Sequence, residues 1–306
     1  MSPELAARAA AQGGVFTRAD AESCGYTLDQ VRQRLDTSRW RALRRGIYTT
    51  CELWPADDEV PPVSVDAAAC LLVAADAVVS DATAATLHGI ALLGRQPRWI
   101  RMTRPRAQGG DCYAKRLTVW PAALPAAHVT RAGDLRVTSP ARTVIDLARR
   151  RGFRDGVVAA DSALHQGLTD AAELSSVVRD CTRWPGIVTA RAAVAFADAA
   201  AESALESLSR IMFVEQDLPM PSLQERVGAY RVDFLWDGRV VGEADGAKKY
   251  DGSNPAALLD EKRRQEALED LGLVVVRWGW DDVVRRPAVT AARIRRALAR
   301  ADQRTA

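Results

Sequence analysis

Three carboxylates lie close together in one short stretch of the chain, residues 230–250, with a spacing that could bind a metal ion. Asp233 falls in one apolar run, and Glu243 and Asp245 fall two residues apart in the next. The pair Asp237-Gly238 between the runs indicates a two-residue hairpin turn, so the carboxylates are expected on neighbouring strands. Strand alternation places Glu243 and Asp245 on one face. Carboxylates are costly to bury unpaired, and Mg²⁺ is the hard cation that usually collects them. The alternative is a hairpin whose polar side chains face water.

Two lysines, Lys248 and Lys249, follow these carboxylates closely enough to reach a phosphate. The segment resembles the core of the PD-(D/E)xK nuclease superfamily, and most closely its branch related to very-short-patch-repair endonucleases, in which a strand Asp and a (D/E)-x-K motif lie on a hairpin. Asp233 matches the first Asp and Glu243 matches the (D/E). Asp245 stands where Lys is usual, and Lys249 is the candidate for the missing cation. The resemblance implies Mg²⁺-dependent hydrolysis, with Asp233 and Glu243 as metal ligands and Asp245 as a further ligand or a general base.

Two flanking segments extend this resemblance. A helix predicted over residues 203–214 carries Glu206, which the resemblance suggests as a third metal ligand or a water-orienting group; an exposed helix glutamate is the alternative. Residues 261–280 match the same branch with the pattern EKRRxxxLxxLGxxVVRWxW. The resemblance implies an α/β core in the order helix, antiparallel hairpin, helix, strand and helix.

Composition sets the broad class of the protein. A chain of 306 residues with 48% hydrophobic and 26% charged residues is long enough for two or three folded domains, and a net charge of +3 by itself indicates no partner. No apolar run reaches about 18 residues and no signal peptide is visible, so we expect a cytoplasmic protein without a membrane span. Five scattered cysteines without C-x-x-C spacing argue against a zinc ribbon and against a disulfide framework.

Residues 1–50 predict two capped helices followed by a basic hairpin, the plan of a winged helix-turn-helix. Thr17 and Thr27 are the predicted N-caps, and the hairpin spans residues 40–48. Arginine phosphate contacts dominate non-specific affinity for nucleic acid, and Arg and Gln are common readers of base edges. The alternative is a solvated helix face beside a packed hairpin. The candidate nucleic-acid-binding residues are Thr27, Gln30, Gln33, Arg34, Arg41, Arg44 and Arg45.

The same segment resembles the N-terminal winged-helix domain of AbiEi-type antitoxins. The matching motifs are Thr17-Arg18-Ala19-Asp20 and Arg45-Gly46-Ile47-Tyr48. The resemblance implies double-stranded DNA as a partner and a cognate toxin protein as another.

A Pro-rich and acidic linker, residues 51–63, is expected to lead into a mixed helix and strand region over residues 64–200. Two of its segments, VSDATAATLHGIALLG and VTSPARTVIDLARR, resemble AbiEi-like proteins. His88 is expected to cap a helix or to pack in a core. Arg142 and Asp146 are expected to form an i,i+4 pair. No reaction follows from these residues.

The predicted architecture is therefore a multi-domain protein of the α+β or α/β class. It comprises a winged helix-turn-helix (1–50), a linker (51–63), a mixed AbiEi-like middle domain (64–200) and a restriction-endonuclease-like core (201–306). The predicted function is a DNA-binding Mg²⁺-dependent endonuclease in a toxin–antitoxin or phage-defence setting. The alternative is an antitoxin-like transcriptional regulator with an inactive nuclease fold. RNA as the target is a third interpretation, since no feature separates it from DNA.

Overall fold

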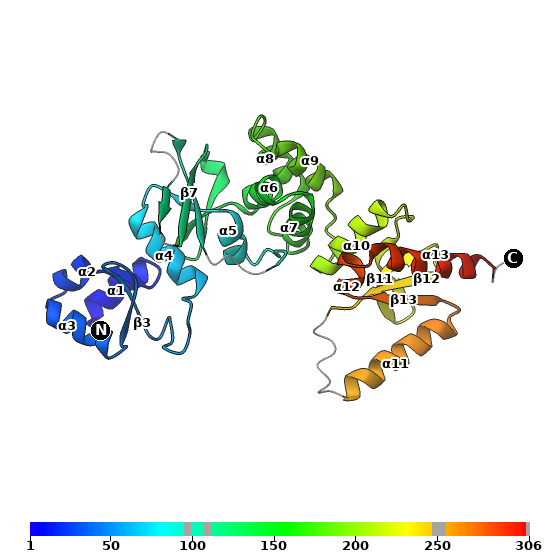
Figure 1. The fold of residues 1–306 in the computed structure, drawn as a ribbon, viewed down its shortest axis with the longest axis horizontal. Helices are drawn as coiled ribbons and strands as arrows, with labels where there is room; N and C mark the ends of the chain where they lie inside the picture. Colours follow the sequence, from blue (N-terminus) through cyan, green and yellow to red (C-terminus); the bar gives the residue numbers. More distant parts are fainter. Residues whose placement is uncertain (95–98, 107–111, 115, 247–254, 304–306) are drawn as a thin grey trace.

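The computed structural model describes residues 1–94, 99–106, 112–114, 116–246 and 255–303, and it has a mixed α+β architecture. Three sheets follow one another along the long axis of the molecule (Figure 1). Among the described residues, no helix combines the length and the apolar character needed to cross a membrane.

The first sheet belongs to a small unit with a compact aromatic core. Its strands run in the order β1-β3-β2, and Phe16, Trp40 and Tyr48 pack within it. Thr17 and Thr27 both cap helices through reciprocal capping boxes, which confirms the two predicted N-caps. The elements are α1 (Pro3–Ala11), β1 (Val15–Thr17), α2 (Arg18–Ser23), α3 (Leu28–Asp36), β2 (Trp40–Arg44) and β3 (Ile47–Thr50).

The second sheet has six strands in the order β6-β7-β5-β4-β9-β8. Its strands are β4 (Val78–Val79), β5 (Ile100–Arg104), β6 (Cys112–Ala114), β7 (Leu117–Pro121), β8 (Val129–Ala132) and β9 (Leu135–Thr138). The helices of this region are α4 (Val63–Val73), α5 (Asp81–His88), η2 (Ala126–His128), α6 (Pro140–Arg151), α7 (Phe153–His165), α8 (Ala171–Asp180) and α9 (Ile187–Phe196).

One prediction for this middle region, the i,i+4 pair, is confirmed. Arg142 Nε donates a hydrogen bond of 2.9 Å to Asp146 Oδ2, and both side chains are buried. His88 is partly buried, and its Nε2 lies 2.8 Å from the carbonyl oxygen of Thr138. The Arg142–Asp146 pair lies within α6, whereas the His88 contact ties α5 to β9.

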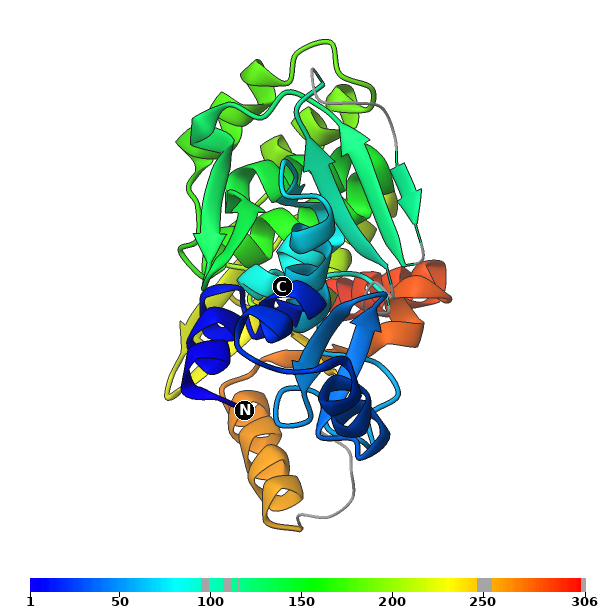
Figure 2. The ribbon, with the colours of Figure 1, turned by 90° about the vertical axis from the view of Figure 1, so that its left-hand side faces the viewer.

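The third sheet has the order β10-β11-β12-β13, with two antiparallel pairings and a final parallel one. One long helix, α11, extends away from this sheet in both views (Figures 1 and 2). The elements are α10 (Ala204–Glu215), β10 (Ser222–Val227), β11 (Tyr230–Trp236), β12 (Val240–Ala244), α11 (Pro255–Asp270), β13 (Val274–Trp278), α12 (Trp280–Val284) and α13 (Pro287–Gln303).

The middle and C-terminal regions share packing across the predicted boundary at residue 200. One hydrophobic cluster runs from the helices of the middle region to the C-terminal sheet, with Ala82 and Ala301 as its first and last buried members. Arg210 on α10 donates a hydrogen bond of 2.8 Å to Asp161 on α7, and both side chains are buried. Helix α10, which carries Glu206, is therefore held by the middle region through Asp161 and by the C-terminal sheet through the shared hydrophobic cluster.

Candidate functional site

The site is built on the predicted hairpin of β11 and β12. Trp236 pairs with Val240, and the turn between them contains Asp237 at φ 48° and Gly238 at φ 67°. The loop is one residue longer than the predicted two-residue turn, because Arg239 also lies outside the pairing. Both turn residues adopt left-handed conformations, which Asp and Gly tolerate better than most residues.

The hairpin brings Asp233 and Glu243 together. The register pairs Phe234 with Gly242, so its continuation places Asp233 opposite Glu243. The Ala244 N–H donates a hydrogen bond of 2.8 Å to Asp233 Oδ2. Glu243 is 2% exposed. Burial, with the nearby charge of Asp233, raises the pKa of Glu243 to about 7.

Glu206 on α10 is buried, so the alternative of an exposed helix glutamate is wrong. Its carboxylate accepts hydrogen bonds from Ser203 Oγ at 2.7 Å, from the Glu202 N–H at 2.9 Å and from Gln224 Nε2 at 2.8 Å. Burial raises the pKa of Glu206, and the charge of Asp233 adds to this rise. Glu206 and Asp233 line a common cavity of about 430 Å³.

Arg264 on α11 is a positively charged side chain that contacts Glu243. Its Nη2 donates hydrogen bonds of 2.6 Å to Glu243 Oε1 and 2.8 Å to the Arg231 carbonyl oxygen. The signal that could have identified Arg264 is its spacing of four residues from Leu268, which is fully buried, because residues at i and i+4 share a helix face.

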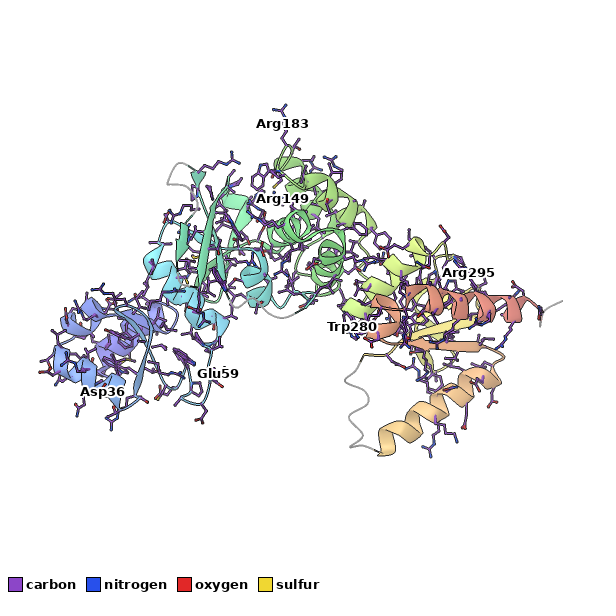
Figure 3. The ribbon with its side chains drawn as sticks, viewed as in Figure 1. Asp36, Glu59, Arg149, Arg183, Trp280 and Arg295 are labelled. Atoms are coloured by element: carbon purple, nitrogen blue, oxygen red, sulfur yellow. The ribbon has the colours of Figure 1, made fainter. Side chains whose placement is uncertain are left out.

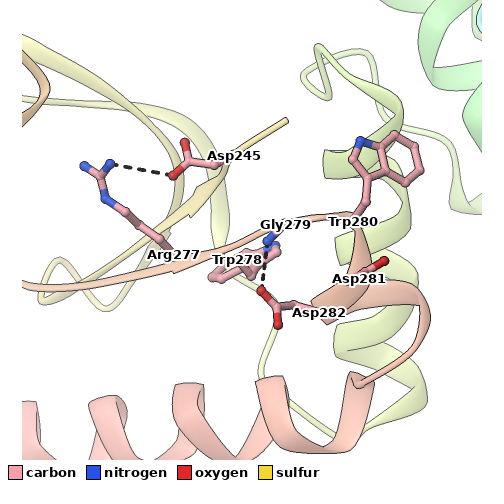
Figure 4. Close-up of a pocket in the computed structure, with 7 residues that line it drawn as sticks. All are labelled: Asp245, Arg277, Trp278, Gly279, Trp280, Asp281 and Asp282. Atoms are coloured by element: carbon pink, nitrogen blue, oxygen red, sulfur yellow. Dashed lines mark hydrogen bonds and ion pairs between the residues drawn. The ribbon is translucent and has the colours of Figure 1, made fainter. Parts of the chain in front are cut away.

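Asp245 and the two lysines complete the predicted set. Asp245 lies just past β12, where its N–H donates to the Trp278 carbonyl oxygen at 2.9 Å. Its Oδ2 is 3.6 Å from Arg277 Nη1 on the neighbouring strand β13 (Figure 4). Lys248 and Lys249 lie outside the described residues.

The donor set suits a hard cation that is held by few protein ligands. Among the described residues, no three His, Cys, Asp or Glu side chains are arranged to hold a metal ion. Glu206 lines the same cavity as Asp233 and stays a predicted third ligand or water-orienting group. Asp233 and Glu243 offer carboxylate oxygens on neighbouring strands, and Mg²⁺ is commonly held by one or two carboxylates together with waters and substrate phosphates. Asp233 and Glu243 thus fit Mg²⁺ as a pair of carboxylate ligands.

The second predicted site, on the N-terminal unit, keeps four of its candidates at the surface: Thr27, Gln30, Gln33 and Arg45. The Gln30 side chain accepts a hydrogen bond of 3.0 Å from the Thr27 N–H, so it also serves as a cap. Arg34 is partly buried, and its guanidinium carbon lies 5.0 Å from the ring centroid of Tyr26.

Arg41 and Arg44 are turned toward the protein. The Arg41 guanidinium carbon lies 3.5 Å from the Trp54 ring centroid, and its Nη1 donates to the Pro55 carbonyl oxygen. Arg44 Nη2 lies 3.0 Å from Asp66 Oδ1 on α4, and the Asp66 side chain is buried. These two arginines fix the hairpin to neighbouring segments, which makes them weaker phosphate-binding candidates than Arg45.

Comparisons with known proteins identify relatives without an assigned function. No family model matches the chain. The uncharacterized proteins Rv2248 and MT2308, from two Mycobacterium tuberculosis strains, are each 35% identical over 181 residues, which is 57% of this chain and 66% of the relative. The chain thus matches just under two thirds of the length of these relatives. The crystal structure of RV2827C protein from Mycobacterium tuberculosis is similar with a TM-score of 0.42 and 16% identity, over 73% of this chain and 84% of that chain.

Proposed function

We propose that the protein binds DNA and that its C-terminal region hydrolyses phosphodiester bonds with Mg²⁺. The observation that carries this proposal is the pairing of Asp233 with a Glu243 carboxyl group whose pKa is raised to about 7. Burying a carboxylate beside another one is unfavourable, and such perturbed groups gather at functional sites. A cation bound between them would offset the cost.

The element order of the C-terminal region supports its assignment as a PD-(D/E)xK nuclease core of the very-short-patch-repair-related branch. Helix α10 precedes the hairpin β11–β12, and α11 and β13 follow it. Strand β13 pairs in parallel with β12 and extends the sheet that carries Glu243. These features match the order that the sequence resemblance implies.

The N-terminal unit supports a role in DNA binding. Two capped helices precede the basic hairpin β2–β3, as expected for a winged helix-turn-helix. We propose that α3 and Arg45 contact double-stranded DNA. An AbiEi-like identity, with a cognate toxin as partner, is part of the same proposal.

Each residue of the C-terminal site has a defined role in this proposal. Asp233 and Glu243 would hold Mg²⁺, which supplies a polarised phosphoryl oxygen and a water of lowered pKa. Arg264 holds the Glu243 carboxylate through a charge-assisted hydrogen bond and can balance negative charge that develops on the phosphate. Asp245 is kept in place by Arg277, and Glu206 by its three hydrogen bonds.

A second candidate function is a regulator that binds DNA through a nuclease fold without activity. The observation that favours it is the position of Arg264, whose guanidinium already neutralises Glu243. The presence of Asp245 at the usual Lys position points the same way. In this case the protein would bind its own promoter and cleave nothing.

Cleavage of plasmid and short duplex DNA with Mg²⁺ or Mn²⁺ separates the two functions. The hydrolase proposal expects metal-dependent cleavage that is lost in Asp233→Ala and in Glu243→Ala. Glu225→Ala, at an exposed position of β10 in the same sheet, is the matched control and should cleave normally. Salt-sensitive promoter binding without any cleavage would refute the hydrolase and support the regulator.

A further inference from the structure

A cavity of about 260 Å³ in the middle region is lined by positive charge. Its described lining contains three arginines, Arg106, Arg149 and Arg150, together with the indole of Trp184, two prolines and an alanine, and it contains no carboxylate. Arg106 follows strand β5, the other two arginines lie near the end of α6, and Trp184 lies in the turn between α8 and α9. The cavity shares no described lining residue with the one beside the candidate metal site.

The carboxylate groups around this cavity are too few to balance its guanidinium groups. Asp146 is shared by two arginines, since its Oδ2 lies 2.9 Å from Arg142 Nε and its Oδ1 lies 3.1 Å from Arg149 Nη2. Arg106 forms no ion pair and no hydrogen bond within the described part of the chain.

A second carboxylate, that of Asp81, is shared by three arginines at longer distances. Its oxygens lie 3.8 Å from Arg151 Nε, 3.9 Å from Arg150 Nε and 4.0 Å from Arg101 Nε. Arg151 also lies 3.4 Å from a carboxylate oxygen of Asp155. Because a hydrogen bond requires a shorter distance, Asp81 does not accept one from Arg150.

The result is a local excess of positive charge. Six guanidinium groups, those of Arg106 and of the five arginines that share Asp146 and Asp81, meet three carboxylates. The next carboxylate, that of Asp180, lies 3.0 Å from His128 Nε2, and His128 Nδ1 lies 3.1 Å from Arg142 Nη1. A guanidinium can only donate, so His128 accepts at Nδ1, is neutral and adds no charge. With Asp180 counted, two positive charges stay unbalanced among the described residues.

Two of the lining arginines are held in place by the protein itself. The Arg149 side chain is 6% exposed, and its Nη1 donates a hydrogen bond of 2.6 Å to the Pro185 carbonyl oxygen. Its guanidinium carbon lies 4.8 Å from the Trp184 ring centroid, and that of Arg150 lies 4.0 Å from the Trp120 ring centroid. Figure 3 shows Arg149 within the middle region. Stacked guanidinium groups lose little further freedom when they bind an anion.

A buried donor and a shifted pKa both favour a bound anion at this site. Arg149 Nε is buried and has no hydrogen-bond partner among the described residues, which is rare for a buried donor. Burial lowers the pKa of Arg150, and the charges of Arg149 and Arg101 lower it further, against the opposing effect of Asp146 and Asp81. A negative charge close to these guanidinium groups would offset both costs.

The charge and the size of the cavity determine the class of ligand. Arginine binds phosphate through pairs of N–H donors in a fixed fork. A phosphomonoester carries a charge of about −1.5 to −2 at pH 7, which matches the excess, whereas a phosphodiester inside a strand carries one negative charge. A cavity of about 260 Å³ admits one phosphate group and little beyond it, since sites for larger ligands begin at about 300 Å³.

We propose that this cavity binds a phosphomonoester group. Two sources can supply such a group, a small phosphorylated molecule and the terminal phosphate of a nucleic-acid strand. The proposal does not rest on the hydrolase, because it uses none of the residues of the candidate metal site.

Calorimetric titration of the purified protein in the presence of EDTA tests the proposal. The probes are inorganic phosphate and one single-stranded oligonucleotide in two forms, with a 5′-phosphate and with a 5′-hydroxyl group. EDTA removes divalent ions that would bring phosphate to Asp233 and Glu243. We expect saturable binding of inorganic phosphate at one site. A strand end as the ligand predicts tighter binding of the 5′-phosphate form, whereas a small molecule as the ligand predicts equal binding of the two forms.

Three variants assign the binding to this cavity. Arg106→Gln and Arg150→Gln should each weaken phosphate binding by about 10-fold, in line with the loss of one charge-assisted hydrogen bond. Neither arginine makes a hydrogen bond within the described part of the chain, so both variants should fold and melt like the wild type. Arg183→Gln is the matched control and should bind phosphate normally. Arg183 precedes Trp184 but does not line the cavity, and it projects outward at the top of Figure 3.

Three results would overturn the proposal. The first is no binding of inorganic phosphate together with equal binding of the two oligonucleotide forms; binding of a synthetic acidic peptide in that case would point to a protein partner instead. The second is phosphate binding that is unchanged in both Arg106→Gln and Arg150→Gln. The third is equal weakening in Arg106→Gln and Arg183→Gln, because the attraction would then come from the general positive charge of the surface.

Discussion

Replacing Glu243 by Gln tests whether the candidate site holds an unfavourable buried charge. Glutamine has nearly the same shape as glutamate but cannot ionise. In the wild-type protein, burial and the neighbouring Asp233 raise the pKa of Glu243 from 4.5 to about 7. Between these two values the folded protein keeps a proton that the unfolded chain has lost. The free energy of unfolding must therefore fall as pH rises through this window, and be highest below it.

The magnitude follows from the size of the window. The difference between 4.5 and about 7, at about 1.4 kcal/mol per pH unit, corresponds to about 3 kcal/mol. Glu243→Gln does not carry this pH-dependent cost. Relative to the wild type, its free energy of unfolding should thus rise by up to about 3 kcal/mol between pH 5 and pH 8. The gain should come at the expense of metal binding, since Gln is a poor Mg²⁺ ligand.

Urea unfolding at pH values of about 5, 6, 7 and 8 measures this difference, with Glu225→Gln as the exposed control that should show none. Added Mg²⁺ should raise the unfolding free energy of the wild type at about pH 8 and leave Glu243→Gln unchanged. A difference between Glu243→Gln and wild type that stays constant with pH would refute the reasoning. A difference in unfolding free energy that falls as pH rises would also refute it, because Arg264 would then stabilise the Glu243 carboxylate more than burial destabilises it.

Three further changes test other parts of the structure. Arg264→Met should slow metal-dependent cleavage by about 100-fold, the usual loss when one charge-stabilising donor is removed. Cleavage at the wild-type rate would show that the Arg264 guanidinium takes no part in the reaction. Asp161→Ala should lower the free energy of unfolding by about 3–5 kcal/mol, because it leaves Arg210 buried without its carboxylate; a loss under about 1 kcal/mol in urea unfolding would contradict this. Arg45→Ala should reduce the slope of log Kd against log salt for duplex DNA by about one, whereas Arg44→Ala should act mainly on stability. Equal salt slopes for wild type and Arg45→Ala would exclude Arg45 as a phosphate contact.

Local signals in the sequence predicted local structure well. The caps at Thr17 and Thr27 are correct because a capping hydrogen bond spans only three residues. The hairpin that pairs Asp233 with Glu243 was also predictable, since a short turn fixes which residues face each other. Only its loop length was wrong, by one residue.

Contacts between distant segments were not predictable from spacing. Arg44 reaches Asp66, and Arg264 reaches Glu243, across separations of 22 and 21 residues. A basic run gives no sign of which guanidinium groups will be turned inward, because that depends on where a second element docks. The core shared across residue 200 was missed for the same reason.

The glycine in the middle of β12 is another feature that only the structure explains. A Cβ atom at Gly242 would lie 2.4 Å from the ring of Trp278, so no larger residue fits without displacing that ring. Gly242 directly precedes Glu243. The close approach of the indole therefore keeps the strand that carries the candidate metal ligand packed tightly on the core.

The central claim is that Asp233 and Glu243 together bind a divalent cation. Crystals soaked in Mn²⁺ and measured at the manganese absorption edge test it most directly, since anomalous scattering locates the ion. We predict a peak between the two carboxylates in the wild type and none there in Asp233→Ala. A wild-type crystal with no peak at this position would contradict the account and leave a DNA-binding regulator as the better description.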